Sequence, residues 1–164
     1  MHRLLDLIAD VVERLHPDAT ALLEVGCGAG NYSLKLLERL PKLQVTLVDL
    51  SQPMLTRAKQ RITTIAGSDC EAIQGDIREI KLGEQQFDVI VAAAVLHHLR
   101  TTDEWNTVFC RLYAALKPGG SLWISDLIEH STSAVQELMW HRYGQYLTEL
   151  KDEQYRDQVF AYVE

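Results

Sequence analysis

Apolar residues recur along the chain in two alternating patterns, short continuous runs and longer stretches with helical spacing. A strand covered on both faces is apolar at nearly every position, so the short runs predict buried strands. Five are expected, at Ala21 to Val25, Gln44 to Asp49, Glu71 to Gln74, Phe87 to Ala93 and Ser121 to Asp126. Because helical stretches separate them, the strands are expected to lie parallel and to be joined by crossover helices.

The helical stretches have recognisable ends. Pro17 and Pro41 each follow a helix, and Gly67 can cap another. A helix N-cap is expected at Thr102 or Asp103. The predicted helices are Leu4 to Leu15, Tyr32 to Leu40, Ser51 to Ala66, Thr102 to Leu116 (ended by 117–120) and Ser133 to Leu150. No further element is predicted for Glu153 to Glu164, which ends in apolar residues. These elements predict an α/β fold with a doubly wound parallel sheet.

Composition narrows the class of protein. The 164 residues carry a formal net charge of −7, which argues against a surface built to bind nucleic-acid phosphates. The sequence shows neither a signal peptide nor an apolar run long enough to cross a membrane, so a soluble, cytoplasmic protein is expected. Three cysteines without a C-x-x-C pair predict neither a disulfide framework nor a metal site. Cys70 and Cys110 are expected to be small core residues.

A glycine-rich turn follows the first predicted strand. Glycine stands at 26, 28 and 30, and because it has no Cβ it lets a ligand approach the backbone closely. The dinucleotide pattern G-x-G-x-x-G needs a small residue where this chain has Asn31. At Cys27 the backbone is expected to matter more than the sulfur. Glu24 can accept a hydrogen bond from the turn or from a ligand ammonium, or it can be structural.

Two carboxylates follow the next two predicted strands. Asp49 lies 19 residues after Gly30, where a βαβ unit brings a carboxylate beside the turn to accept hydrogen bonds from ribose hydroxyls. Asp76 follows Gly75 and can accept from an exocyclic amine, while the backbone N–H of Ile77 can face a ring nitrogen. Their alternatives are a strand end or helix cap for Asp49 and an ordinary Gly-Asp turn for Asp76.

Two adjacent histidines, His97 and His98, follow the fourth predicted strand. Neighbours in sequence do not share a helical face, so a metal site made from this pair is not expected. We expect His98 to face the pocket as a polar contact or proton acceptor, and His97 to be a loop residue.

Together these motifs resemble those of class I S-adenosylmethionine-dependent methyltransferases. The likeness is carried by the glycine turn with its preceding strand and by four later segments, and it covers about Leu4 to Asp126. These segments are Val48-Asp49-Leu50-Ser51 with Met54, Gly75-Asp76-Ile77, Phe87 to Ile90 with Leu96 to Leu99, and Leu116 to Gly120. The resemblance implies a Rossmann-like sheet with strand order 3-2-1-4-5 and S-adenosylmethionine as cofactor.

The resemblance also implies roles for particular residues. Gly26, Cys27 and Gly28 would approach the methionine part of the cofactor, and Asp49 would hold the ribose. The adenine would pack on Leu50 and Met54 and would form hydrogen bonds with Asp76 and Ile77, and Gly75 beside them would also contact the cofactor. Backbone near Ala93, with Val95 or His98 beyond it, would border the sulfonium, and His98 is the candidate base.

The family pattern predicts a small-molecule acceptor, with a tRNA wobble uridine as the alternative. Residues 1–130 would form the cofactor-binding core and 131–164 an incomplete substrate or lid region. The family's C-terminal antiparallel hairpin is not recognisable, so we expect a fragment or shortened relative whose fifth strand has an open edge, through which a dimer could form. Two rivals stay open: a non-catalytic module that binds cofactor or a partner, and a nicotinamide oxidoreductase, which Asn31 opposes.

Overall fold

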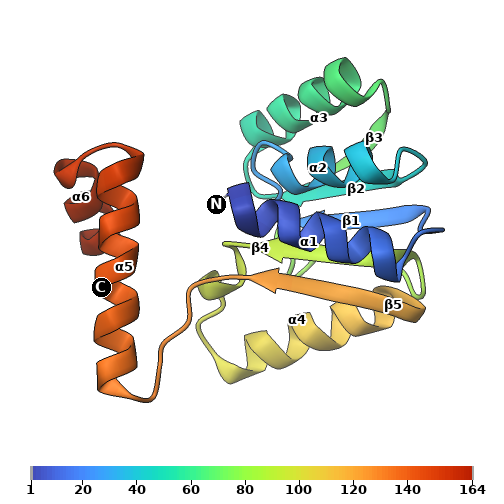
Figure 1. Cartoon of the computed structure of the whole chain (residues 1–164). Coiled ribbons are helices and arrows are strands. Elements are labelled where there is room, and N and C mark those ends of the chain that lie inside the picture. The colour runs from blue at the N-terminus through green and yellow to red at the C-terminus, as the bar shows by residue number, and fades with distance from the viewer. Residues whose placement is uncertain (1, 164) are drawn as a thin grey trace. The chain divides into compact units, whose positions relative to one another are not determined.

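The computed structural model describes residues 2–163, with side chains for 4–161, and the chain divides into two compact units, Met1–Asp126 and Leu127–Glu164. A five-stranded parallel sheet in the order β3-β2-β1-β4-β5 forms the centre of the first unit (Figure 1). Its strands are β1 (Ala21–Val25), β2 (Gln44–Asp49), β3 (Cys70–Gln74), β4 (Phe87–Ala93) and β5 (Leu116–Ser125). The predicted fold class and strand order are confirmed. Within residues 2–163 no strand follows β5.

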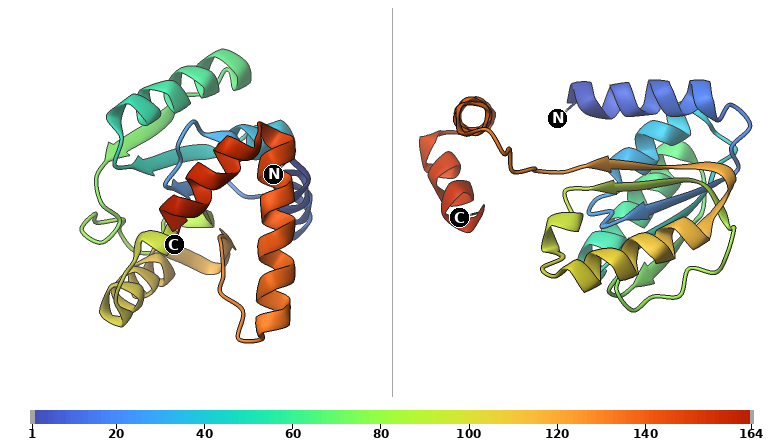
Figure 2. Two further views of the ribbon diagram at one scale, coloured as in Figure 1. Left: turned by 90° about the vertical axis from the view of Figure 1, so that its left-hand side faces the viewer. Right: turned by 90° about the horizontal axis from the view of Figure 1, so that it is seen from below.

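Helices cover both faces of the sheet (Figures 1 and 2). They are α1 (His2–Leu15), α2 (Asn31–Arg39) and α3 (Gln52–Ala66) on one face and α4 (Thr102–Ala115) on the other, with the short 3-10 helix η1 (Leu96–His98) after β4. Alternate residues of β4 enter the two cores: Val89 and Val91 pack with α1 to α3, and Ile90 and Ala92 pack with α4. Burial on both faces is why this strand is apolar throughout.

The register of the strands brings the candidate residues to one edge of the sheet. Val25 at the end of β1 pairs with Val48 of β2 and with Ala92 of β4. The turn after β1, Asp49 and the segment after β4 therefore leave the sheet side by side. In open parallel sheets the carboxyl ends of the strands, at the point where the strand order reverses, are where ligands bind.

Asp88 fastens the opposite edge, where the strands begin. Its Oδ2 accepts hydrogen bonds from the backbone N–H groups of Thr20 and Ala21, each at 2.9 Å, and from Lys117 Nζ at 2.8 Å. Partial burial opposes ionisation, but these bonds and the lysine charge hold the pKa of Asp88 below its usual range. One carboxylate thus ties the starts of three neighbouring strands together.

The fifth strand begins earlier than the sequence predicts. The expectation that residues 117–120 end a helix is wrong, because α4 ends at Ala115 and Leu116 already pairs with Phe87. The register then jumps, so that Val89 pairs with Ser121, and the extra residues include Pro118 and a glycine at φ 81°. A proline and a glycine in a strand usually mark an edge or a bulge, and here they mark both.

Three smaller expectations also need correction. The α4 cap is Thr101 rather than the predicted Thr102 or Asp103, and it forms a capping box with Glu104. Cys110 is exposed rather than in the core, whereas Cys70 is buried as predicted. Leu4 and Leu15, the apolar residues at the two ends of the first predicted helix, are 43% and 61% exposed rather than in the core.

The second unit is a pair of helices, α5 (Ser133–Leu150) and α6 (Glu153–Val163). The sequence predicts no element after Glu153, and α6 shows that this expectation is wrong. Phe160 of α6 stacks on Trp140 of α5 with ring centroids 4.7 Å apart, and this contact stabilises the pair. Among the large apolar side chains of α5, Leu147 is buried. Val135, Leu138 and Met139 stay 41% to 50% exposed.

Candidate cofactor pocket

The glycine turn after β1 has a backbone that only glycine adopts without strain. Gly26, Gly28 and Gly30 have φ angles of 63°, 50° and 74°. At Gly26 space is also lacking, because a Cβ there would lie 2.4 Å from Cγ2 of Val95. At Gly28 a Cβ would meet no heavy atom within 4 Å. The first glycine is therefore required by packing, and the second faces open space.

Asp49 anchors this turn. Its Oδ2 accepts a hydrogen bond from Gly28 N and its Oδ1 from Ser51 N, each at 2.8 Å. The carboxylate thus bridges the turn after β1 and the N-cap of α3. Cys27 contributes its backbone, with its N–H donating to Val48 O at 3.1 Å. Burial, with repulsion from Glu24 and Asp49, raises the pKa of the Cys27 thiol to about 12, so it is not a nucleophile at neutral pH.

A cavity of about 210 Å³ lies at this edge of the sheet. Eight residues singled out from the sequence line it: Gly26, Asp49, Leu50, Gly75, Asp76, Ile77, Val95 and His98. Five others do not: Glu24, Cys27, Gly28, Met54 and Ala93. The volume is below the range of roughly 300–1,000 Å³ that is usual for pockets of drug-sized ligands, so a larger ligand would extend beyond it.

Sequence reasoning missed five lining residues, Val25, Val48, Arg78, Ala94 and Leu99. Val25 and Val48 could have been found, because each is the last or next-to-last residue of a predicted strand that ends at the pocket. Ala94 has a left-handed φ of 52°, and the presence of an alanine in a sequence does not predict such a conformation. For Arg78 there is no signal either, because a single arginine in a polar stretch usually faces solvent.

Glu24 bonds to α2 and does not line the cavity. It is 3% exposed, and its Oε2 accepts hydrogen bonds from the backbone N–H of Ser33 at 3.0 Å and from the Ser33 hydroxyl. Burial raises the pKa of this carboxyl to about 7, although the bonds from Ser33 oppose the shift. In this position Glu24 joins β1 to the first turn of α2, which is the structural alternative for this residue.

Asp76 is engaged by an arginine. Arg78 Nε lies 3.0 Å from both carboxylate oxygens of Asp76, and its Nη1 lies 2.5 Å from Glu104 Oε1. The side-chain bonds from Arg78 hold the pKa of Asp76 below its usual range, against partial burial. Asp76 is therefore ionised at neutral pH, and a ligand amine that bonds it must share it with Arg78.

The two histidines of η1 have different surroundings. His98 lines the cavity, and its pKa is lowered by partial burial and by the nearby His97 and Arg100, against a raising effect of Asp126. His97 instead contacts Asp126, with 2.7 Å between Nδ1 and Oδ1. A neutral imidazole at the pocket can accept a proton, which is the chemistry expected of His98.

The described part of the chain lacks both a metal-binding cluster and a membrane-spanning helix. Residues 2–163 contain no group of three or more His, Cys, Asp or Glu side chains arranged to hold a metal ion. No helix among them is long and apolar enough to cross a membrane.

Comparison with known proteins identifies the family. Residues 22–120 match a family model described as a methyltransferase domain, and this match spans the glycine turn, Asp49, Asp76 and both histidines. The chain belongs to the class I S-adenosylmethionine-dependent methyltransferases. The five parallel strands in the order 3-2-1-4-5 agree with this membership.

Methyltransferases that act on different acceptors resemble this chain. It is 38% identical over 105 residues to a malonyl-[acyl-carrier protein] O-methyltransferase of Priestia megaterium, covering 64% of this chain and 36% of that protein. A dTDP-amino-sugar N,N-dimethyltransferase of Streptomyces venezuelae is 33% identical over 115 residues, covering 69% of this chain and 45% of that protein. This chain therefore spans less than half the length of either relative.

A solved structure shows the likeness in three dimensions. S-adenosylmethionine-bound CalS10, an amino pentose methyltransferase from Micromonospora echinaspora, superposes with a TM-score of 0.63 at 30% identity. The match covers 77% of this chain and 51% of that one. The cofactor of the family is thus seen bound to a relative of this methyltransferase domain.

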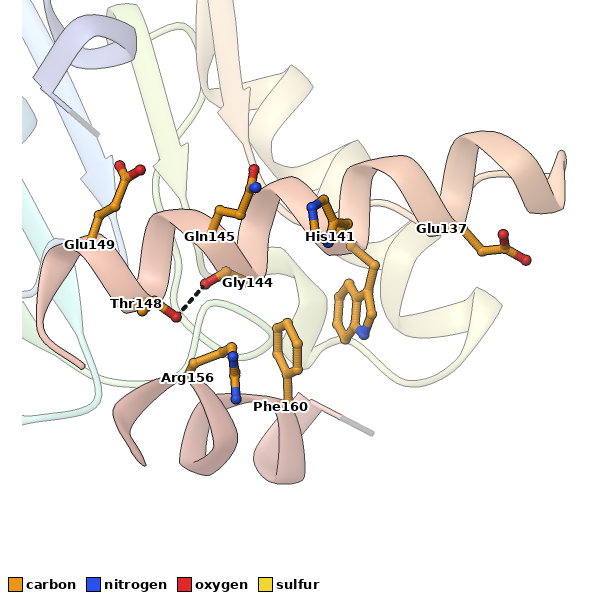
Figure 3. A pocket seen from close by; sticks show the side chains of 9 residues that line it. Glu137, His141, Gly144, Gln145, Thr148, Glu149, Arg156 and Phe160 are labelled. Carbon is orange, nitrogen blue, oxygen red and sulfur yellow. Dashed lines mark hydrogen bonds between the residues drawn. The ribbon is translucent and has the colours of Figure 1, made fainter. Parts of the chain in front are cut away.

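A larger hollow lies within the second unit, between α5 and α6 (Figure 3). Its volume is about 620 Å³, and Trp140 and Phe160 give it an aromatic wall. Polar groups surround that wall, among them Glu137, Glu149 and Arg156. None of the motifs that identify the methyltransferase family contributes to this hollow.

We expect Glu24→Gln to change how stability depends on pH. The pKa of Glu24 is raised on folding from about 4.5 to about 7, so the wild-type protein loses stability from this group as pH rises through that window. Gln stays neutral, so the variant should gain up to about 3 kcal/mol relative to wild type between pH 4.5 and 8. Urea unfolding at both pH values measures this, and a constant difference between the proteins would contradict it.

Gly26→Ala and Gly28→Ala form a matched pair. Both place alanine in a left-handed conformation, which costs about 1–2 kcal/mol, but only at Gly26 does the new Cβ meet Val95. Gly26→Ala should therefore be about 1–3 kcal/mol less stable than Gly28→Ala, the usual cost of overpacking. Urea unfolding of both variants tests this, and equal stabilities would show that Val95 moves aside freely.

Proposed function

We propose that this chain binds S-adenosylmethionine in the pocket at the carboxyl ends of β1, β2, β3 and β4 and transfers its methyl group to a small molecule. The observation that carries the proposal is the convergence on one 210 Å³ cavity of Gly26, Asp49, Leu50, Asp76 and Ile77. These residues offer close backbone approach, two acceptor carboxylates and apolar walls, which is what a nucleoside needs.

Each part of the pocket has a group suited to one part of the cofactor. Asp49 would accept hydrogen bonds from the ribose hydroxyls, since its carboxylate is already oriented by Gly28 and Ser51. Leu50 is 66% exposed at the rim, and packing on the adenine would remove it from water. Asp76, shared with Arg78, would accept from the adenine amine.

The transfer asks little covalent chemistry of the protein. When bound, S-adenosylmethionine would supply a methyl group carried on a sulfonium sulfur. As the acceptor bonds to the methyl group, the S–CH3 bond breaks and the sulfur becomes a neutral thioether. The chain must align the acceptor and exclude water. For an oxygen or nitrogen acceptor, the neutral imidazole of His98 would take the proton that the acceptor loses.

We assign residues 1–130 to the cofactor-binding core and 131–164 to part of a substrate or lid region. The hollow between α5 and α6 supports the second assignment, because an aromatic wall with a polar rim suits an organic acceptor. The relatives act on a sugar nucleotide and on an acyl group carried by a protein, and these favour a small-molecule acceptor over tRNA. We also propose a cytoplasmic location and a dimer formed through the edge of β5 that does not pair with β4.

Titration calorimetry with S-adenosylmethionine tests the cofactor proposal. Wild type should bind it and should not bind NAD, and Asp49→Ala should weaken binding at least about tenfold by removing a charged acceptor. Asp103→Ala, an exposed carboxylate in the first turn of α4, is the control and should bind like wild type. Binding of NAD alone would instead favour an oxidoreductase.

A methyl-transfer screen over pooled metabolites and tRNA separates an enzyme from a binding module. If an oxygen or nitrogen acceptor is found, the rate of wild type should rise with pH through the lowered pKa of His98, because only the neutral imidazole accepts a proton. His98→Asn should slow transfer about 10²–10⁴-fold and abolish that pH dependence. Full activity in this variant would exclude His98 as the base, and binding without transfer would favour the module.

A further inference from the structure

We propose that Asp126 and His97 are positioning residues. They hold the segment 94–98 against the glycine turn and so give the cofactor pocket its shape. The inference rests on the proposed function of that pocket. It assigns a role to two residues outside the pocket lining, His97 in η1 and Asp126. Asp126 directly follows β5, the strand farthest from the glycine turn on this side of the sheet.

The carboxylate of Asp126 meets this segment at three points. Its Oδ2 accepts hydrogen bonds from the backbone N–H groups of Val95 and His97, each at 3.2 Å. Its Oδ1 lies 2.7 Å from Nδ1 of His97. Because an ionised carboxylate can only accept, Nδ1 of His97 carries the proton in this pair. The Asp126 side chain is 8% exposed, so water competes little for these bonds.

The segment so held is strained and does not stay in place by itself. Ala94 has a φ of 52°, a left-handed conformation that costs an alanine free energy and persists only where neighbours impose it. The Ala94 N–H donates to Ser125 O at 2.7 Å, so the last residue of β5 and Asp126 act on consecutive residues of the segment. The end of β5 is therefore the element that imposes the strained turn.

The segment 94–98 forms two walls of the pocket. Val95 is pressed against Gly26, so closely that no Cβ fits there, and His98 lines the cavity beside Leu99. The ring of His97 lies against that of His98, with centroids 4.2 Å apart. Without the hydrogen bonds to Asp126, Val95 would lose its contact with Gly26, and His98 would no longer line the cavity.

The structure contains a matched control for Asp126. Asp88 also accepts from two backbone N–H groups and from one basic side chain, but at the opposite edge of the sheet. Asp88→Asn and Asp126→Asn each replace a carboxylate that joins neighbouring segments by an amide of the same size. If both residues served only stability, the two variants should behave alike.

The experiment measures S-adenosylhomocysteine binding by calorimetry and the ring signals of His97 and His98 by NMR, in wild type and both variants. Asp126→Asn should weaken binding about tenfold or more, the loss of a charged hydrogen bond, while Asp88→Asn binds like wild type. The Nδ1–H signal of His97 should disappear in Asp126→Asn alone. The His98 titration should also shift, since its charged neighbours are His97, Arg100 and Asp126.

Each result decides the inference. Equal binding in Asp126→Asn and wild type, with unchanged His98 signals, would overturn it while leaving the cofactor proposal intact. If wild type itself does not bind, the cofactor proposal fails, and the NMR signals alone decide whether Asp126 positions the segment. Should Asp126→Asn not fold, His97→Ala removes only the partly exposed ring; it should move the His98 titration and weaken binding, and no change in either would overturn the inference.

Discussion

The contact of Val95 with Gly26 is the constraint on which the pocket depends. It brings the segment after β4 so close to the turn after β1 that even a methyl group at position 26 has no room. Two left-handed backbones meet at this contact, Gly26 at φ 63°, which glycine adopts without strain, and Ala94 at φ 52°, which is strained. Parallel register makes the meeting possible, because β1 and β4 end side by side, and hydrogen bonds from β5 hold it closed.

Carboxylates accept many of the hydrogen bonds that join strands and turns around this contact, and each carboxylate joins different segments. Asp49 bridges the glycine turn to α3, while Asp126 holds the segment after β4. Asp88 does the same at the other edge of the sheet, and buried Glu24 ties β1 to α2. Asp76 is the exception, since its partner is a partly exposed side chain, Arg78, rather than the backbone of a neighbouring strand or turn. Bonds to the sheet and turns thus frame a pocket in which one carboxylate is held by a surface side chain.

The sequence predicted those features whose cause is local or periodic. Burial on both faces makes a parallel strand such as β4 apolar throughout, and the glycine turn with Asp49 has a spacing set by one βαβ unit. It could not predict features set by tertiary contacts. The left-handed Ala94 is imposed by β5, the early start of β5 by pairing with Phe87, and helix α6 by the stack of Phe160 on Trp140. Nor does the sequence predict the contact of His97 with Asp126, because the two residues lie 29 positions apart along the chain.

Membership of the family constrains the cofactor more than the acceptor, and the arrangement of the first unit explains why. The residues suited to a nucleoside come from the ends of β1, β2 and β3, which the sheet fixes relative to one another. Methyl transfer needs alignment more than special groups, so acceptor choice can lie in any surface that presents a nucleophile. A malonyl-[acyl-carrier protein] O-methyltransferase and a dTDP-amino-sugar N,N-dimethyltransferase can therefore both resemble this chain, and the acceptor must be sought in residues outside the glycine turn and Asp49.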